Sequence, residues 1–109
     1  MKRGEVWWVE FETTPNSNVQ KTRPAVIVSN NLSNEYAGRV QIILATSKVS
    51  KLYPCECFVT ILGKKAKLMA DQIVTAPKSR LAGYIQTLTL DEQIAVNQIL
   101  KIQLDLMDA

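Results

Sequence analysis

The sequence has 109 residues, which is enough for one domain with a buried core but too few for two. Its hydrophobic fraction of 47% and charged fraction of 21% are ordinary for a globular protein and exclude a disordered or fibrous chain. Thirteen basic and ten acidic residues give a formal charge of +3, which is compatible with nucleic-acid binding without requiring it. We therefore expect a single domain over residues 1–109.

The chain shows no pattern of export or membrane insertion. Its apolar runs are much shorter than a membrane span, and Glu10 interrupts the apolar stretch that follows the basic N-terminus. We expect a cytoplasmic protein with no membrane partner.

Cys55 and Cys57 are the only cysteines, and in a chain without histidine they are a poor match to the four ligands of zinc. We interpret them as small core residues in a reducing compartment, with a redox pair as the less favoured alternative.

Two strands are predicted in the first thirty residues. Residues 5–11 alternate in the face to which they point, and one tryptophan, Trp7 or Trp8, lies on each face. Residues 13–18 form a turn-rich polar loop. Residues 25–29 then form a short apolar strand of the type that is buried on both faces.

The middle of the chain predicts further β-structure after a short helix or turn at residues 30–34. The expected strands are residues 39–45, 55–61, 65–70, 71–75 and 82–87. The second and third of these should pair as a hairpin through residues 62–64, and residues 71–75 should continue the third strand after a kink. Pro77 begins a single turn before the last strand.

A C-terminal helix is predicted from Leu90 to about Met107, because Thr89 and Glu92 have the spacing of a capping box. Its apolar residues cover one face and part of the side: Ala95, Ile99, Ile102 and Leu106, then Val96, Leu100, Leu104 and Met107. This arc is wider than packing on a small barrel requires. Together with the two-sided first strand it favours a homodimer, and the alternative is a helix sunk deep in its own domain.

Five to seven short strands followed by one helix predict a mainly β fold with a C-terminal α-helix. The strands are short enough for a small SH3-like barrel, in a single domain.

The stretch from Gln20 to Asn30 combines a polar loop with an apolar strand. Pro24 restricts Arg23 to extended geometry at the entrance of that strand. An arginine held in this way is a candidate anion contact, although for this stretch alone a solvated surface charge is the simpler interpretation.

Arg3-Gly4-Glu5-Val6-Trp7, Thr22-Arg23-Pro24, Ala45-Thr46-Ser47 and Asp71-Gln72-Ile73 follow one another along the chain. In this order and spacing they resemble the MazF/PemK family of toxin endoribonucleases, of the Kid/CcdB superfamily. The resemblance implies a CcdB/PemK-type barrel and an mRNA interferase that cleaves single-stranded RNA at specific sequences, without a metal, a cofactor or the ribosome. It also implies a cognate antitoxin that neutralises the toxin.

The residues themselves limit the chemistry. Without histidine, the chain cannot use a histidine pair as base and acid, and its carboxylates Glu35, Glu56 and Asp71 are scattered among separate elements. What remains is a reaction in which the RNA 2′-hydroxyl attacks its own phosphate while the protein stabilises charge. The resemblance assigns the catalytic roles to Arg23 and Thr46, the arginine on the charged phosphate and the threonine as an assisting donor.

The resemblance places RNA contacts in the loop before Arg23 and near the Thr-Ser and Asp-Gln motifs. The substrate-binding candidates are Asn16, Ser17, Asn18, Gln20, Lys21, Ser47, Lys48, Asp71 and Gln72. Their amides have the donors and acceptors that base edges require, but each is equally compatible with an ordinary turn residue. Asp71 is also a candidate base, a partner that holds Arg23, or simply a turn residue.

The chain departs from the family pattern at two places. A Glu-Gln pair of many members falls on Asn18 and Val19, and an arginine of some members falls on Met69. The general base therefore stays unidentified. Two alternatives remain open: a non-catalytic toxin that binds a protein target such as gyrase, and a nucleic-acid-binding barrel that does not cleave.

Overall fold

The computed structural model describes residues 1–10 and 21–107. Within them the chain forms six strands, two α-helices and one 3-10 turn. The strands are β1 (Glu5–Glu10), β2 (Thr22–Ile27), β3 (Arg39–Thr46), β4 (Glu56–Ile61), β5 (Lys64–Pro77) and β6 (Leu81–Thr87). The helices are α1 (Asn31–Tyr36) and α2 (Leu90–Leu104), and η1 (Lys78–Arg80) is the 3-10 turn.

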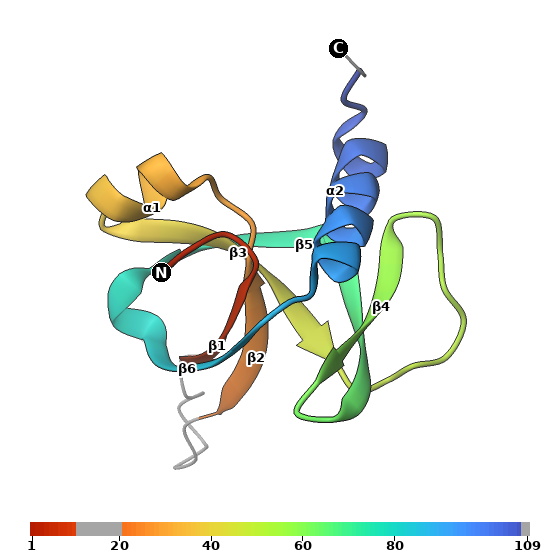
Figure 1. Cartoon of the computed structure of the whole chain (residues 1–109), viewed down its shortest axis with the longest axis horizontal. Coiled ribbons are helices and arrows are strands. Elements are labelled where there is room, and N and C mark those ends of the chain that lie inside the picture. The colour runs from red at the N-terminus through yellow and green to blue at the C-terminus, as the bar shows by residue number, and fades with distance from the viewer. Residues whose placement is uncertain (11–20, 108–109) are drawn as a thin grey trace, which may run out of the picture.

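All six strands join one antiparallel sheet in the order β4-β5-β3-β2-β1-β6. The sheet is strongly curled (Figure 1), and hydrogen bonds bring its edge strands β4 and β6 together. Gln86 on β6 bridges these edges: its Nε2 donates to the Thr60 carbonyl at 2.8 Å, and its Oε1 accepts from the Leu62 N–H at 2.9 Å. The predicted mainly β fold with a C-terminal helix is confirmed, as a half-barrel closed by side chains.

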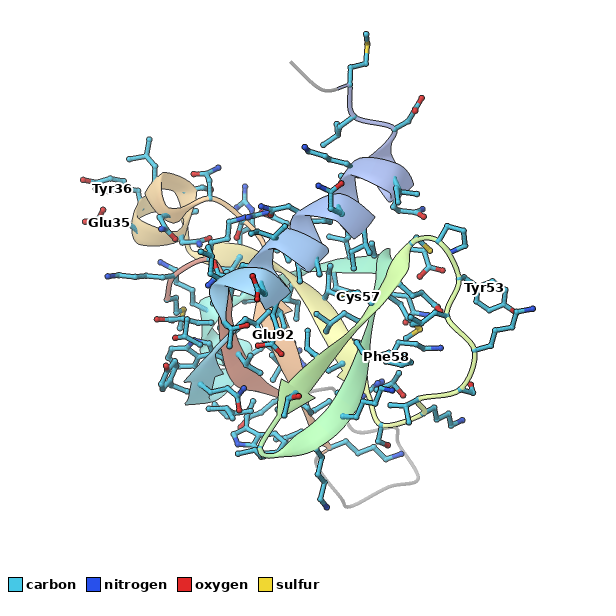
Figure 2. All side chains as sticks on the ribbon, turned by 45° about the vertical axis from the view of Figure 1, so that its right-hand side comes forward. Glu35, Tyr36, Tyr53, Cys57, Phe58 and Glu92 are labelled. Carbon is cyan, nitrogen blue, oxygen red and sulfur yellow. The ribbon has the colours of Figure 1, made fainter. Side chains whose placement is uncertain are left out.

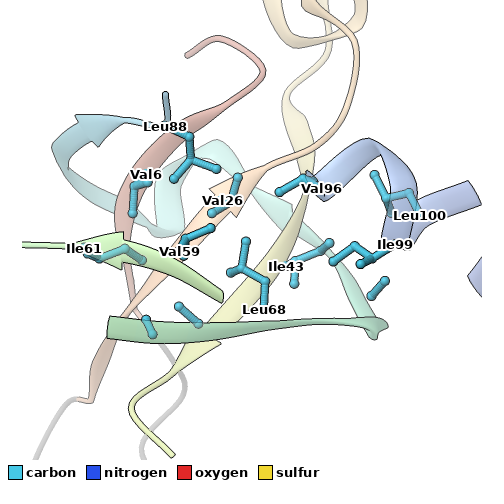
Figure 3. Packing of buried hydrophobic residues seen from close by; sticks show 13 residues of the cluster. Val6, Val26, Ile43, Val59, Ile61, Leu68, Leu88, Val96, Ile99 and Leu100 are labelled. Atoms are coloured by element: carbon cyan, nitrogen blue, oxygen red, sulfur yellow. The ribbon is translucent and has the colours of Figure 1, made fainter. Parts of the chain in front are cut away.

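Strands β2 and β3 are buried on both faces, as predicted for the apolar run after Arg23. Val26 and Ile43 belong to a core cluster beneath α2, while Ala25, Ile27 and Leu44 belong to a second cluster on the opposite face. Figure 3 shows the first cluster, in which side chains from five strands meet those of α2. Burial on both faces fixes the register of β2 and β3, because a slip of one residue would exchange the two sets of side chains.

The predicted capping box at the start of α2 is present, and it also joins the helix to the sheet. Thr89 Oγ1 accepts from the Glu92 N–H, and Glu92 Oε1 accepts from the Thr89 N–H. The other oxygen of Glu92 accepts from the Thr60 N–H at 2.7 Å. One carboxylate therefore caps the helix and holds the edge strand β4 against it.

The predicted C-terminal end of the helix was wrong. Helix α2 ends at Leu104, because Asp105 takes a left-handed conformation with φ of 52° and the Leu106 N–H donates to the Lys101 carbonyl. The buried side chains of α2 are Val96, Ile99 and Leu100, whereas Ile102 and Leu106 are more than half exposed. The C-terminal end of α2 extends beyond the sheet (Figure 1), and the described residues leave about half of each of these two side chains exposed.

Strand β2 differs from the prediction at both of its ends, and it ends at Ile27 rather than at residue 29. Strand β2 begins at Thr22 rather than Ala25, since residues 22–26 pair with β1. Strand β1 is described only to Glu10, so Phe11 lies outside the described residues. The hairpin between β4 and β5 is confirmed, with a two-residue turn in which Leu62 and Gly63 both have positive φ.

Strand β5 is continuous over the two predicted segments, and the expected kink appears as a register shift against β3. Ile43 pairs with Ile73, but Ala45 pairs with Leu68. More residues of β5 than of β3 lie between these two pairs, so β5 bulges over Met69–Gln72.

The two cysteines lie at the margin of the core rather than inside it. Cys55 and Cys57 are free thiols, half-buried, and both pack against the cluster beneath α2. Burial raises the pKa of the Cys57 thiol to about 11, and the negative charge of Glu92 adds to the rise. Figure 2 shows Cys57 on β4 and Glu92 at the start of α2. A thiol with a raised pKa is a poor nucleophile at neutral pH, which agrees with a packing role.

Neither helix among the described residues is long and apolar enough to cross a membrane.

Gly4 joins β1, β2 and the start of α2, and its conformation excludes a side chain. Its φ is 89°, its N–H donates to the Ile27 carbonyl, and its carbonyl accepts from the Leu88 N–H. A Cβ atom would lie 2.6 Å from Cδ of Gln93, whose side-chain amide donates to the Leu88 carbonyl. The positive φ therefore favours glycine at this position, and a side chain would also displace the Gln93 amide from its hydrogen bond to the Leu88 carbonyl.

We expect Gly4→Ala to lower the free energy of unfolding by about 2 kcal/mol, because it combines a positive φ with a steric clash. Gly38→Ala is the matched control, since its φ is not positive and a Cβ there meets no atom within 4 Å. Urea unfolding followed by circular dichroism measures both variants. Equal stability of Gly4→Ala and Gly38→Ala would contradict this account of the junction.

Candidate active site

Arg23 is the second residue of β2, close to the strand entrance at which it was expected. It pairs with Val9 of β1, and the following Pro24, which lacks an N–H, lies one residue before the ladder with β3 begins at Ala25. The side chain is half-buried, and Nη2 donates to the Ala45 carbonyl at 3.0 Å. One edge of the guanidinium is thereby anchored to β3, and within residues 1–10 and 21–107 its other N–H groups have no further hydrogen-bond partner.

Thr46 is the last residue of β3, directly after the carbonyl to which Arg23 is anchored. Its Oγ1 accepts from the Lys48 N–H at 3.2 Å, which turns the chain out of the strand. Because the hydroxyl accepts in this contact, its proton is still available for donation. The structure therefore places a guanidinium and a hydroxyl donor side by side, although 22 residues separate them in the chain.

Arg23 and Thr46 line one cleft of about 530 Å³. The described residues that line it are Arg23, Thr46, Ser47, Lys48, Ser50, Lys67 and Met69. Three of these are basic and none is acidic. Such a cleft is chemically suited to an anion, with charged groups and hydroxyl donors from β2, β3, β5 and the loop that follows β3.

Four of the predicted site residues thus come together in the cleft: Arg23, Thr46, Ser47 and Lys48. Asp71 and Gln72 do not line it; both are exposed on the bulge of β5. The Arg23 guanidinium is held by a backbone carbonyl, which does not support the prediction that Asp71 holds it. Lys21 is exposed, and Asn16, Ser17, Asn18 and Gln20 lie outside the described residues.

Lys67 is the residue that the sequence analysis missed. It is 7% exposed, and its Nζ lies 3.3 Å from Oε1 of Glu56 on β4. The available signal was its position in β5, where it alternates with the buried residues Ala66 and Leu68. A lysine at such a place in a strand points to the face opposite the core beneath α2, and this face holds the cleft.

Among residues 1–10 and 21–107, no three cysteine, aspartate or glutamate side chains come together as potential metal ligands.

Comparison with known proteins agrees with this architecture. Residues 2–104 match the family model for the PemK-like, MazF-like toxin of type II toxin–antitoxin systems. A relative, the endoribonuclease MazF9 of Mycobacterium tuberculosis, is 32% identical over 115 residues, covering 97% of this chain and 98% of the relative.

Solved structures show the same fold over nearly the whole chain. The MazE–MazF structure (form II) from Deinococcus radiodurans has a TM-score of 0.82 and 25% identity, covering 98% of this chain and 97% of that one. An endoribonuclease in complex with its cognate antitoxin from a Mycobacterial species has a TM-score of 0.80 at 23% identity, covering 100% and 99%. At this lower identity the likeness concerns the fold alone. By the match to the family model and the identity to MazF9, the chain belongs to the PemK-like, MazF-like toxin family of type II toxin–antitoxin systems.

Proposed function

We propose that the protein is an endoribonuclease toxin that cleaves single-stranded RNA at specific sequences, independently of metal ions and of the ribosome, in the cytoplasm. Residues 1–109 form its one toxin domain. The observation that carries the proposal is the cleft that Arg23 and Thr46 share with two lysines and, among the described residues, no acidic side chain. Family membership and the endoribonuclease relative support this function over gyrase poisoning or binding without cleavage.

The reaction uses a nucleophile that the substrate carries. The ribose 2′-oxygen attacks the adjacent phosphorus and the 5′-oxygen leaves, so the protein has to position the strand and stabilise the negative charge. The Arg23 guanidinium, anchored through Nη2 to the Ala45 carbonyl, presents its remaining donors to the phosphate oxygens. The Thr46 hydroxyl donates a hydrogen bond to an oxygen of the same phosphate. Ser47 and Lys48 at the mouth of the cleft bind the neighbouring RNA.

RNA enters the cleft as a single strand with its bases turned outward. Of the remaining predicted contacts, Asn16, Ser17, Asn18, Gln20 and Lys21 belong to the segment that precedes Arg23, and Asp71 and Gln72 lie on the β5 bulge outside the cleft. We propose that these residues contact bases rather than the reacting phosphate.

A toxin of this family is neutralised by a cognate antitoxin. We expect the partner to have an acidic, flexible segment that occupies the basic cleft and so excludes RNA. Co-expression with the small acidic protein encoded beside the toxin gene should restore growth and yield a co-purifying complex. A complex that still cleaves RNA would contradict occupation of the cleft.

Helix α2 supports the proposal of a homodimer. Ile94 and Leu104 are about half exposed, and with Val28 and Ile73 they line a mainly apolar groove of about 520 Å³.

We expect light scattering to show twice the chain mass of 12.2 kDa, and Leu104→Asp to give a folded monomer. Leu62→Asp, at an exposed hairpin turn, is the control that should remain dimeric. A dimer that survives Leu104→Asp would exclude this face as the interface.

For cleavage, we expect Arg23→Ala to reduce the rate by a factor of about 100 to 1,000, because it removes a preorganised donor from the charged transition state. Thr46→Ala should cost about tenfold, as the loss of one hydroxyl donor. The measurement is cleavage of a long single-stranded RNA in EDTA, with the cut ends mapped. Arg39→Ala is the matched control, since Arg39 is an exposed arginine at the start of β3 that does not line the cleft. Full activity of a folded Arg23→Ala protein would refute the mechanism.

A further inference from the structure

Lys67, which lines the Arg23 cleft, forms an ion pair with Glu56, and both side chains are almost entirely removed from solvent. The exposed fractions of the side chains are 9% for Lys67 and 8% for Glu56. Lys67 and Asn34 are the only buried polar or charged residues in the described part of the chain. Removing a charge from water is costly, and a buried ion pair seldom adds more stability than apolar residues of the same volume. Stability therefore does not explain why a lysine lies here.

The strand registers place Lys67 directly beside the proposed catalytic threonine. Thr46 of β3 is its partner on one side, and Phe58 of β4 is its partner on the other. Directly opposed residues of antiparallel strands have side chains on the same face, with Cβ atoms about 5 Å apart. Glu56, two residues before Phe58 on β4, points to this face as well. A row of functional side chains thus crosses the sheet from Thr46 through Lys67 to Glu56.

The contacts of Lys67 are long for a charged donor. Nζ lies 3.3 Å from Oε1 of Glu56 and 3.4 Å from the carbonyl oxygen of Lys51, whereas charge-assisted hydrogen bonds of this type are about 2.8 Å long. The same oxygen of Glu56 accepts from the Tyr53 N–H at a shorter distance, 2.9 Å. Glu56 therefore makes its shorter contact with the loop that precedes β4. The Lys67 ammonium, which lines the cleft, makes only the two longer contacts among the described residues.

We propose that Lys67 is a phosphate-binding residue of the cleavage site, and that Glu56 is a positioning residue that keeps the ammonium in place until RNA enters. The inference rests on the proposed function, since the ligand is the RNA backbone phosphate next to Thr46. On binding, the phosphate replaces Glu56 as the nearer anion to Lys67. Glu56 also accepts a hydrogen bond from the Tyr53 N–H in the loop before β4. A change in its contact with Lys67 therefore also acts on this loop.

The decisive measurement is the salt dependence of binding to a random-sequence pool of 2′-O-methyl RNA oligonucleotides, which lack the attacking hydroxyl. Each phosphate contact contributes about 0.7 to the slope of log K against log salt for a single strand. We expect Lys67→Met to reduce the slope by about this amount and to lower affinity about tenfold at low salt. Lys67→Arg should restore the slope. Lys2→Met removes an exposed lysine that does not line the cleft and should change neither value.

Glu56→Gln separates phosphate binding from anchoring of the loop. The amide oxygen can still accept from the Tyr53 N–H, but the charge that competes with phosphate is gone. We expect this variant to bind the oligonucleotide pool more tightly than the wild type, with an undiminished slope. If the pair only anchors the loop, Glu56→Gln will leave the affinity unchanged and Lys67→Met will leave the slope unchanged, which would overturn the inference.

Lys67→Met leaves Glu56 buried without its cationic partner, so circular dichroism must confirm that this variant folds. If it does not, the double variant Lys67→Met/Glu56→Gln removes both charges and provides the same slope test. Cleavage of a long RNA is measured in parallel. Wild-type protein that does not cleave would refute the proposed function, even where the slope still identifies Lys67 as a phosphate contact. Wild-type protein that cleaves, with an unchanged slope in Lys67→Met, would refute the inference alone.

Discussion

The register of β3 against its two neighbours is the constraint on which the site depends. Strand β3 pairs with β2 through Ala25 and Leu44 on one side and with β5 through Thr46 and Lys67 on the other. Because side chains alternate between the faces of a strand, a slip of one residue would turn the cleft side chains into the core and expose apolar residues. Such a slip is opposed by burial on both faces of β2 and β3. The geometry of the cleft is therefore a consequence of core packing.

The cleft continues the second core cluster to the end of the strands. Ala25 and Leu44 belong to that cluster, and Arg23 and Thr46 follow two residues farther out on the same strands and the same face. The polar side chains of Arg23 and Thr46 thus follow directly after the apolar residues of the cluster, on strands whose backbone the core packing fixes. Donors held in this way need little reorganisation when charge develops, and this is the physical basis for stabilising a phosphoryl transition state. The charged groups are separated from the helix-covered core by the thickness of the sheet.

Sequence reasoning was reliable where structure is decided by near neighbours. The capping box at Thr89 and Glu92 and the hairpin turn at Leu62 and Gly63 are confirmed. The two-sided burial predicted for residues 25–29 is confirmed for residues 25–27. It failed at the end of α2, where apolar residues continue past the left-handed Asp105 although the helix does not. The sequence could not show that Asp71 and Gln72 lie on the β5 bulge rather than in the lining of the Arg23 cleft, because the bulge depends on pairing with β3.

By itself, the sequence determined the type and order of the elements and, through resemblance, that Arg23 and Thr46 belong to one site. These properties depend on local periodicity, turn chemistry and motifs, which a linear chain displays directly. Only the tertiary structure decided that Lys67 lies opposite Thr46 and that Glu56 is its counterion. Lys67 is 21 positions from Thr46 and 11 from Glu56, and their proximity depends on strand registers set by the packing of both cores. Packing of that kind is a property of the whole fold, so no local pattern shows it.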